Sequence, residues 1–306
     1  MKWIIIALII LTVILFLIAY ILIRLSFLRV TKQTPTADNW KTYEEVNQKG
    51  REFIQTKNPK EISVTSFDGL ILKGLYVENT IKDKTIIFVH GYKAKDGLYD
   101  GGASAKFLYS TGYNLLFVDD RAHGKSQGKY IGFGVLDCKD VNVWVNKLIK
   151  EYNQKTIILY GISMGAATVL NASSIVDQNT VKGVVADCGF ASGYDEVCYQ
   201  IKQMYHLPSF PLVPIANFLM KIICSYSLDE KEAYKSIKQY KNHLLLIHGG
   251  KDHFVNTEDV YKIYENANCD KDLLVVDNAS HALSYLKNPK EYEKHFLKLI
   301  EKVNEE

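Results

Sequence analysis

The pattern of hydrophobic and polar positions divides the chain into three parts, and the first part is almost entirely apolar. Residues 3–23 form a run of 21 positions without a charged side chain. As a helix, this run would be about 31 Å long, which matches the hydrocarbon core of a bilayer. Residues 24–29 (RLSFLR) lack the small-residue site at which a signal peptide is cleaved. We therefore predict an uncleaved transmembrane anchor, residues 1–30, that contacts membrane lipid.

The charges that flank this run leave the side of the membrane open. Lys2 precedes it, and Arg24, Arg29 and Lys32 come after it. Counting positive charges places the body of the protein in the cytoplasm. A very short N-terminal tail is instead typical of a signal anchor that exports the rest of the chain. Both orientations stay open.

The second part, residues 31–60, is polar and predicts a linker with one amphipathic helix over 40–54. In the third part, from residue 61, short apolar runs alternate with helical stretches. Apolar runs without polar alternation are typical of strands covered on both faces, and this order predicts a doubly wound, mostly parallel β-sheet. A hairpin at Asp68-Gly69, between 61–67 and 70–77, would add an antiparallel edge. The other predicted strands are 85–90, 114–119, 156–161, 181–187, 244–248 and 273–277, and the predicted helices are 101–111, 135–151, 164–176, 258–268 and 289–303.

One interval inside this third part, residues 190–242, contains no apolar strand run. It is rich in aromatic residues and carries three prolines. Insertions of this length between strands usually have a function. We predict a helical cap over a binding site, within a catalytic domain spanning 61–306. The alternative is a pair of ordinary helices packed on the sheet.

Composition excludes several classes of protein. The chain has 37 basic and 34 acidic residues and a formal net charge of +3, which argues against nucleic acid as a partner. Five cysteines show no C-x-x-C spacing, and no Cys/His cluster has the spacing of a zinc site. We therefore expect neither a disulfide framework nor a metal or other cofactor.

A candidate nucleophile lies in residues 161–165, Gly-Ile-Ser-Met-Gly, directly after the predicted strand 156–161. A serine on a tight strand-to-helix turn projects above the end of the sheet. The two flanking glycines avoid collisions with neighbouring backbone in such a turn. This context predicts Ser163 as the nucleophile.

A serine nucleophile needs a base and an acid that orients the base. His281 lies in a loop just after the last predicted strand, at the sheet edge where open α/β sheets bind ligands. Asp252 comes after the preceding strand, 244–248, and is the preferred acid. Asp187, at the end of strand 181–187, is the competing candidate. For the oxyanion, we expect backbone N–H groups of Met164 and Tyr92 to act as donors.

Taken together, these segments resemble the α/β-hydrolase fold family, and the chain is similar to bacterial serine aminopeptidases and monoacylglycerol lipases. Besides the serine turn, residues 90–92 (HGY) resemble the family's oxyanion segment, and 119–126 (DDRAHGKS) resemble its D-x-R-G-x-G-x-S turn. Ala122 replaces the usual glycine of that turn. Residues 248–252 (HGGKD) and 279–281 (ASH) resemble the acid and histidine segments. The resemblance covers about residues 60–303 and implies acyl-transfer chemistry on this fold.

We therefore expect a membrane-anchored serine hydrolase that cleaves carboxylic esters through an acyl-enzyme. The aromatic cap and the anchor favour a hydrophobic acyl substrate. One alternative is an aminopeptidase, in which Asp195 or Glu196 would bind the substrate's α-amine. Two further alternatives are a non-catalytic binding protein on a hydrolase scaffold and an oligomerisation module whose cap mediates contacts.

Overall fold

The computed structural model describes residues 1–29 and 40–305. Its centre is an eight-stranded sheet in the order β1-β2-β4-β3-β5-β6-β7-β8. Strands β3 to β8 run parallel, while β1 and β2 form an antiparallel hairpin that joins the sheet at β4. The predicted fold, a mostly parallel sheet with an antiparallel hairpin at one edge, is confirmed. The strands are β1 Lys60–Thr65, β2 Ile71–Val77, β3 Ile81–Val89, β4 Tyr113–Val118, β5 Thr156–Ile162, β6 Val181–Asp187, β7 His243–Gly249 and β8 Lys271–Val276.

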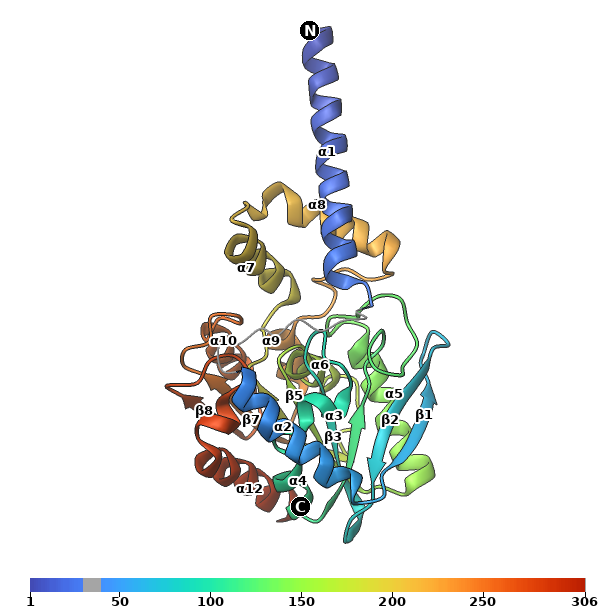
Figure 1. Cartoon of the computed structure of the whole chain (residues 1–306), viewed down its shortest axis with the longest axis vertical. Helices are drawn as coiled ribbons and strands as arrows, with labels where there is room; N and C mark the ends of the chain where they lie inside the picture. Colours follow the sequence, from blue (N-terminus) through green and yellow to red (C-terminus); the bar gives the residue numbers. More distant parts are fainter. Residues whose placement is uncertain (30–39, 306) are drawn as a thin grey trace.

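Helices cover both faces of this sheet (Figure 1). On one face, Trp144 of α5 and Val169 of α6 contribute to the largest hydrophobic cluster. On the other face, Phe107 of α4 and Phe296 of α12 build a second cluster. The helices of the body are α2 Trp40–Gln55, α3 Gly97–Gly101, α4 Ala105–Ser110, α5 Asp137–Tyr152, α6 Met164–Ala172, α10 Glu258–Asn266, α11 Ser284–Lys287 and α12 Pro289–Glu305.

Strand β3 explains why the apolar runs lack alternation. Ile87 and Val89 belong to the first cluster, whereas Ile86 and Phe88 belong to the second. All four side chains are buried. Because successive side chains of a strand point to opposite faces, a strand covered on both sides must be apolar at every position.

One predicted helix, over 101–111, is wrong in its bounds, because the segment forms two short helices, α3 and α4. The carboxylate of Asp96 accepts a hydrogen bond from the Tyr99 N–H and starts α3 earlier than predicted. Gly101 and Gly102 then favour a break. A Cβ on Gly102 would lie 2.1 Å from Asn47 Oδ1, so the glycine also permits close packing of α2.

The interval 190–242 divides into two structural parts. Helices α7 (Gly193–Tyr205) and α8 (Ser209–Ile223) lie above the sheet domain, at the level of the lower half of the N-terminal helix (Figure 1). Helix α9 (Ala233–Ser236) and the following 3₁₀ turn (Ile237–Gln239) instead return to the body and contribute Ala233 and Ile237 to the first cluster.

The N-terminal helix α1, Lys2–Phe27, is long and apolar enough to cross a membrane. Most of it projects away from the body, and only Ala19, Ile23 and Phe27 are buried. Just after the helix, Arg29 N–H donates to the carbonyl of Lys129, and the carbonyl of Phe27 accepts from Ile131 N–H. These bonds fix the end of α1 to the body. Part of the predicted linker, residues 30–39, lies outside the described residues, and the domain boundaries stay predictions.

Candidate active site

Ser163 occupies a sharp turn between β5 and α6, with φ of 56° and ψ of −118°. Its backbone N–H donates to the carbonyl of Asp187 over 2.8 Å. The glycines on either side are required by close backbone approach. A Cβ on Gly161 would lie 2.2 Å from the carbonyl oxygen of Gly165, and a Cβ on Gly165 would lie 2.1 Å from that of Val89. The local sequence thus allows a strained conformation that directs the serine side chain away from the carboxyl edge of the sheet.

The fold brings Ser163, His281 and Asp252 together. His281 Nε2 lies 2.8 Å from Ser163 Oγ, and His281 Nδ1 lies 2.8 Å from Asp252 Oδ2. The other carboxylate oxygen, Oδ1, accepts the N–H groups of Phe254 and Val255 at 2.9 Å each. When the carboxylate accepts the Nδ1 proton, Nε2 is left as an acceptor for the serine hydroxyl. Ser163 and Asp252 are each only 6% exposed.

The environment of Asp252 keeps its carboxylate ionised. His248 Nε2 lies 3.3 Å from Asp252 Oδ2, so two histidines flank the same carboxylate. Burial raises the pKa of Asp252. The hydrogen bonds to His248 and His281 outweigh burial and hold this pKa well below its usual range. The carboxylate is therefore negatively charged beside the imidazole throughout the neutral range.

The competing acid, Asp187, makes a different contact. Its Oδ2 accepts the phenol hydroxyl of Tyr292 over 3.0 Å, and Tyr292 in turn lies 2.8 Å from the hydroxyl of Tyr160. Burial raises the pKa of Asp187 to about 6. Of the two acids considered from sequence, Asp252 is therefore the one that is hydrogen-bonded to His281.

The loop after β3 passes directly beside the nucleophile. A Cβ on Gly91 would lie 3.4 Å from Ser163 Cβ. The Gly91 N–H donates to Asp100 Oδ2 over 2.9 Å, which fixes the loop. Within residues 1–29 and 40–305, the N–H groups of Tyr92 and Met164 have no hydrogen-bond acceptor. Sequence reasoning missed Asp100, because it lies in no motif and reaches the loop only through the fold.

The same loop also contacts the end of α1, which sequence reasoning did not predict. The hydroxyl of Tyr92 donates to the carbonyl of Ser26 over 2.5 Å, and Lys93 Nζ lies 3.0 Å from the carbonyl oxygen of Leu25. The Arg29 guanidinium donates to two carbonyls of the 119–126 turn, at 2.5 and 2.6 Å. No sequence pattern could reveal these contacts, because every acceptor is a backbone carbonyl.

A third hydrophobic cluster joins three parts of the chain. It contains Met164 beside the serine, Phe27 of α1 and Met220 of α8. The rings of Phe27 and Phe133 meet edge to face at 5.3 Å between centroids. Apolar side chains of α1 and α8 therefore belong to one packed cluster with the residue that follows the nucleophile.

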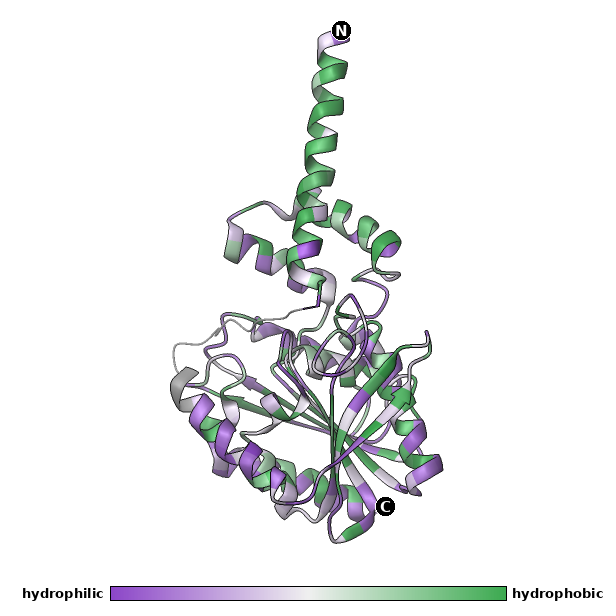
Figure 2. Ribbon diagram, turned by 45° about the vertical axis from the view of Figure 1, so that its right-hand side comes forward, coloured by the Kyte–Doolittle hydropathy of each residue, from purple (hydrophilic) through white to green (hydrophobic). Residues whose placement is uncertain are grey.

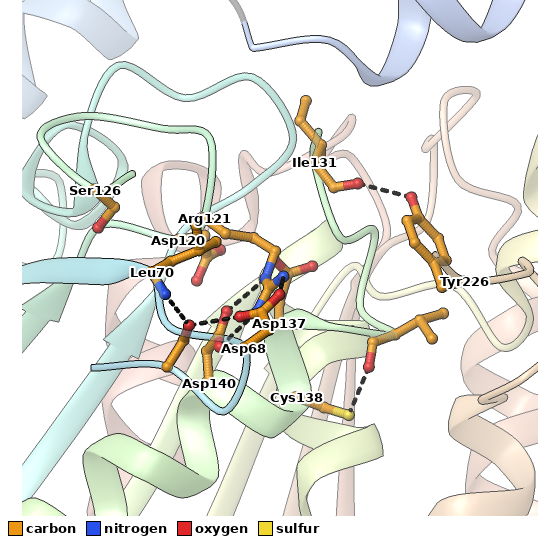
Figure 3. Close-up of polar contacts among 12 residues, drawn as sticks. Asp68, Leu70, Asp120, Arg121, Ser126, Ile131, Asp137, Cys138, Asp140 and Tyr226 are labelled. Atoms are coloured by element: carbon orange, nitrogen blue, oxygen red, sulfur yellow. Dashed lines mark hydrogen bonds and ion pairs between the residues drawn. The ribbon is translucent and has the colours of Figure 1, made fainter. Parts of the chain in front are cut away.

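The 119–126 turn is held by an ion-pair cluster around Arg121 (Figure 3). Arg121 makes two hydrogen bonds to Asp140 of α5, at 2.7 and 2.8 Å, and two to Asp68 of the hairpin, at 2.9 and 3.2 Å. Such paired contacts fix the turn against both elements. Ala122 has φ of 62°, a left-handed conformation that glycine adopts more easily. The replacement noted in the motif therefore costs backbone strain.

One group among the described residues has metal-ligand chemistry. Atoms of Cys188, Asp252 and His281 lie within 4.8 Å of one another. Asp252 and His281 are already in direct contact at 2.8 Å, which suits a shared proton between them. Burial raises the pKa of the Cys188 thiol well above its usual value, which disfavours the thiolate that binds metals.

Comparisons with known proteins identify relatives of the chain. A family model described as serine aminopeptidase, S33, matches residues 80–204, which include the loop after β3 and the serine turn. The chain is 30% identical over 243 residues to the uncharacterized protein YqkD of Bacillus subtilis (strain 168), covering 79% of each chain. It is 26% identical over 229 residues to the uncharacterized protein YfhR of Escherichia coli (strain K12), covering 72% of this chain and 73% of that one.

Solved structures show the same fold. The esterase Pf2001 of Pyrococcus furiosus superposes with a TM-score of 0.64 at 26% identity, over 80% of this chain and 93% of that one. The acylaminoacyl peptidase of Pyrococcus horikoshii shares the fold at 18% identity, with a TM-score of 0.58, over 79% of this chain and 40% of that one. The sheet order, the strained serine turn and these relatives together lead to one assignment: the chain belongs to the α/β-hydrolase family, among the hydrolases related to the S33 serine aminopeptidases.

Proposed function

We propose that this protein is a serine hydrolase that cleaves carboxylic esters of hydrophobic acyl groups. One observation carries the proposal, namely the hydrogen-bonded series from Ser163 Oγ through His281 to Asp252, with both contacts at 2.8 Å. A serine is a weak nucleophile by itself. An adjacent base, oriented by a carboxylate, gives it the reactivity needed for acyl transfer.

The reaction proceeds in two halves. His281 Nε2 takes the hydroxyl proton as Ser163 Oγ attacks the ester carbonyl, and the resulting oxyanion accepts hydrogen bonds from the Tyr92 and Met164 N–H groups. His281 then gives the proton to the leaving alkoxide, and the acyl-enzyme remains. In the second half, His281 deprotonates a water, which attacks the acyl carbon. The acid leaves as the proton returns to Ser163, and Asp252 stabilises the imidazolium in both halves.

Ester cleavage is favoured over removal of an N-terminal amino acid because the two carboxylates that an aminopeptidase would use, Asp195 and Glu196, are poorly suited to bind an α-amine. Asp195 lies 3.4 Å from Lys262 Nζ, so a cation already pairs with it. Glu196 is buried and accepts a hydrogen bond from Gln200, and burial raises its pKa to about 8. The apolar cluster that contains Met164 and the solved structure named an esterase agree with this choice. The S33 family description keeps the aminopeptidase as the second candidate.

The proposal includes attachment to a membrane. Helix α1 has the length and composition of a membrane span, and its outer turns expose aliphatic side chains that would be poorly accommodated in water. The enzyme would therefore act on substrates that partition into or near the bilayer.

The test uses the full-length protein in detergent with a fluorophosphonate probe. We expect one label per chain at Ser163, mapped by mass spectrometry, and at least a 10³-fold loss of p-nitrophenyl ester turnover in Ser163→Ala. Ser174→Ala, a matched change two residues beyond the end of α6, should leave both the labelling and the ester turnover unchanged. Comparing p-nitrophenyl esters with aminoacyl anilides separates esterase from aminopeptidase. Undiminished turnover in Ser163→Ala, or a folded protein that takes no label, would refute the proposal and favour a binding protein.

A further inference from the structure

An apolar surface on the cap adjoins the base of α1. We call it the cap face, and it comprises Met204, Tyr205, Leu207, Phe210, Phe218 and Ile222. Phe210, Phe218 and Ile222 are 76%, 58% and 65% exposed. Figure 2 shows α1 almost entirely hydrophobic, and much of α8 beside it is hydrophobic too. Exposed apolar surface of this kind marks an interaction site rather than ordinary protein surface.

The depth at which α8 meets α1 indicates what covers this surface. Ala19 and Ile23 of α1 are buried in the same cluster as Ala216 and Met220 of α8. Beyond these buried contacts, α1 continues only over Lys2–Ile18, which is 17 residues. At about 1.5 Å per residue this part is about 26 Å long, shorter than a hydrocarbon core of about 30 Å. If α1 crosses the bilayer, α8 must lie at the membrane surface.

Two further features agree with that depth. Thr12, Val13, Phe16, Leu17 and Tyr20 of α1 form, with Leu219 of α8, a groove of about 320 Å³ with almost entirely apolar walls. A lipid acyl chain suits such walls better than water does. Near the same level, the Arg24 guanidinium lies over the ring of Tyr20, and both side chains are exposed. Tyrosine and arginine are typical of the boundary between hydrocarbon and headgroups.

The geometry points to the cap face as a membrane-docking surface that lies in the interfacial layer of the leaflet through which α1 leaves the bilayer. This inference rests on the membrane attachment included in the proposed function and extends it. The cap face then contacts the lipid, so the domain has a fixed orientation at the membrane. Because the loop beside Ser163 is hydrogen-bonded to the last turn of α1, the site lies on the side of the domain that faces this leaflet and takes acyl substrates from it.

The test measures depth by fluorescence and does not depend on catalysis. The full-length protein with Trp40→Phe is reconstituted in phosphatidylcholine vesicles whose acyl chains carry bromine at carbons 6 and 7 or at carbons 11 and 12. Trp144 stays as a constant signal because it is only 1% exposed in the core. Trp3 reports insertion of α1. Phe218→Trp and Ile222→Trp place reporters on the cap face, and Leu297→Trp on α12 is the matched exposed control.

We expect the added emission at positions 218 and 222 to fall by about half or more with the shallow bromines and by less with the deep ones. Emission from position 297 should not change. If Trp3 is quenched while positions 218 and 222 behave like position 297, the docking surface is refuted and the anchor survives. If Trp3 is also unquenched, α1 does not enter the bilayer, and the anchor and the docking surface both fail. Ester turnover measured separately leaves the catalytic proposal standing in either case.

Discussion

The hydroxyl of Tyr92 lies 2.5 Å from the backbone carbonyl oxygen of Ser26 and donates a hydrogen bond to it. Tyr92 belongs to the loop beside the nucleophile, and Ser26 belongs to the last turn of α1. The helix that we assign to the membrane is therefore also a structural support of the catalytic site. A neighbouring contact, between Lys93 Nζ and the Leu25 carbonyl, reinforces the same connection.

Removing the Tyr92 hydroxyl should weaken catalysis more than binding. Tyr92→Phe keeps the backbone N–H but releases the loop from α1, and we expect a 3- to 10-fold lower kcat, on the order of 1 kcal/mol, with little change in KM. Steady-state kinetics with a soluble ester measures this. Tyr240→Phe is the control, since its buried hydroxyl donates to the Val181 carbonyl far from the site. Equal losses of kcat in both variants would contradict a positioning role.

Deleting α1 should inactivate the enzyme rather than simply release it from the membrane. A protein of residues 31–306 loses Phe27, Ile23 and the contacts of Ser26 and Arg29 with the body. We expect at least a 10-fold lower turnover of a soluble ester and a lower Tm, both measured in detergent. A protein of residues 19–306 keeps these contacts and should retain most of the activity. Full activity of the shorter protein would show that α1 is dispensable for the site.

The two candidate acids should differ sharply when each is made neutral. Asp252→Asn removes the carboxylate that holds His281, and we expect kcat to fall by 10³- to 10⁴-fold. Asp187→Asn alters the contact with Tyr292 and should change kcat by less than 10-fold. Kinetics with p-nitrophenyl esters at pH 8 measures both. A larger loss in Asp187→Asn would assign the acid to Asp187.

The buried carboxyl of Glu196 should make stability depend on pH. Burial raises its pKa from 4.5 to about 8, so the folded protein binds a proton that the unfolded chain releases. The stability contributed by this proton is complete below about pH 4.5 and is lost as the pH rises through about 8. Glu196→Gln should thus match wild type at pH 4.5 and be more stable by up to about 3 kcal/mol at pH 7.

Denaturant unfolding at the two pH values measures the effect at Glu196. Asp195→Asn is the matched control, because Asp195 is exposed beside Lys262. This variant should lack the gain in stability at pH 7 that we expect for Glu196→Gln. A Glu196→Gln variant that is less stable than wild type at pH 7 would show that the native carboxyl is ionised and paired.

Much of the site could be predicted from the sequence because its signals are local. The turn at 161–165 requires two glycines at fixed spacing, and these single out Ser163 between them. His281 and Asp252 come just after parallel strands, whose carboxyl ends meet at one sheet edge. Other features lacked a local signal. Asp100 accepts a hydrogen bond from Gly91 only because the fold brings the two residues together. The break of the predicted helix at Gly101-Gly102 depends on close packing that the sequence pattern does not encode.

By itself, the sequence determined the kinds of elements and their order. Residues 86–89 of β3 and most of β5 are apolar because both faces of these segments are covered, and α1 has the length and the apolar composition of a membrane span. Only the tertiary structure decided how α1 is attached to the body of the protein. Its attachment depends on carbonyls of residues 25–27, which any sequence would supply, and on a cap helix that crosses it at Ala19 and Ile23. Contacts to backbone groups far apart in the chain leave no residue pattern, so only the fold shows that α1 and the candidate site are joined.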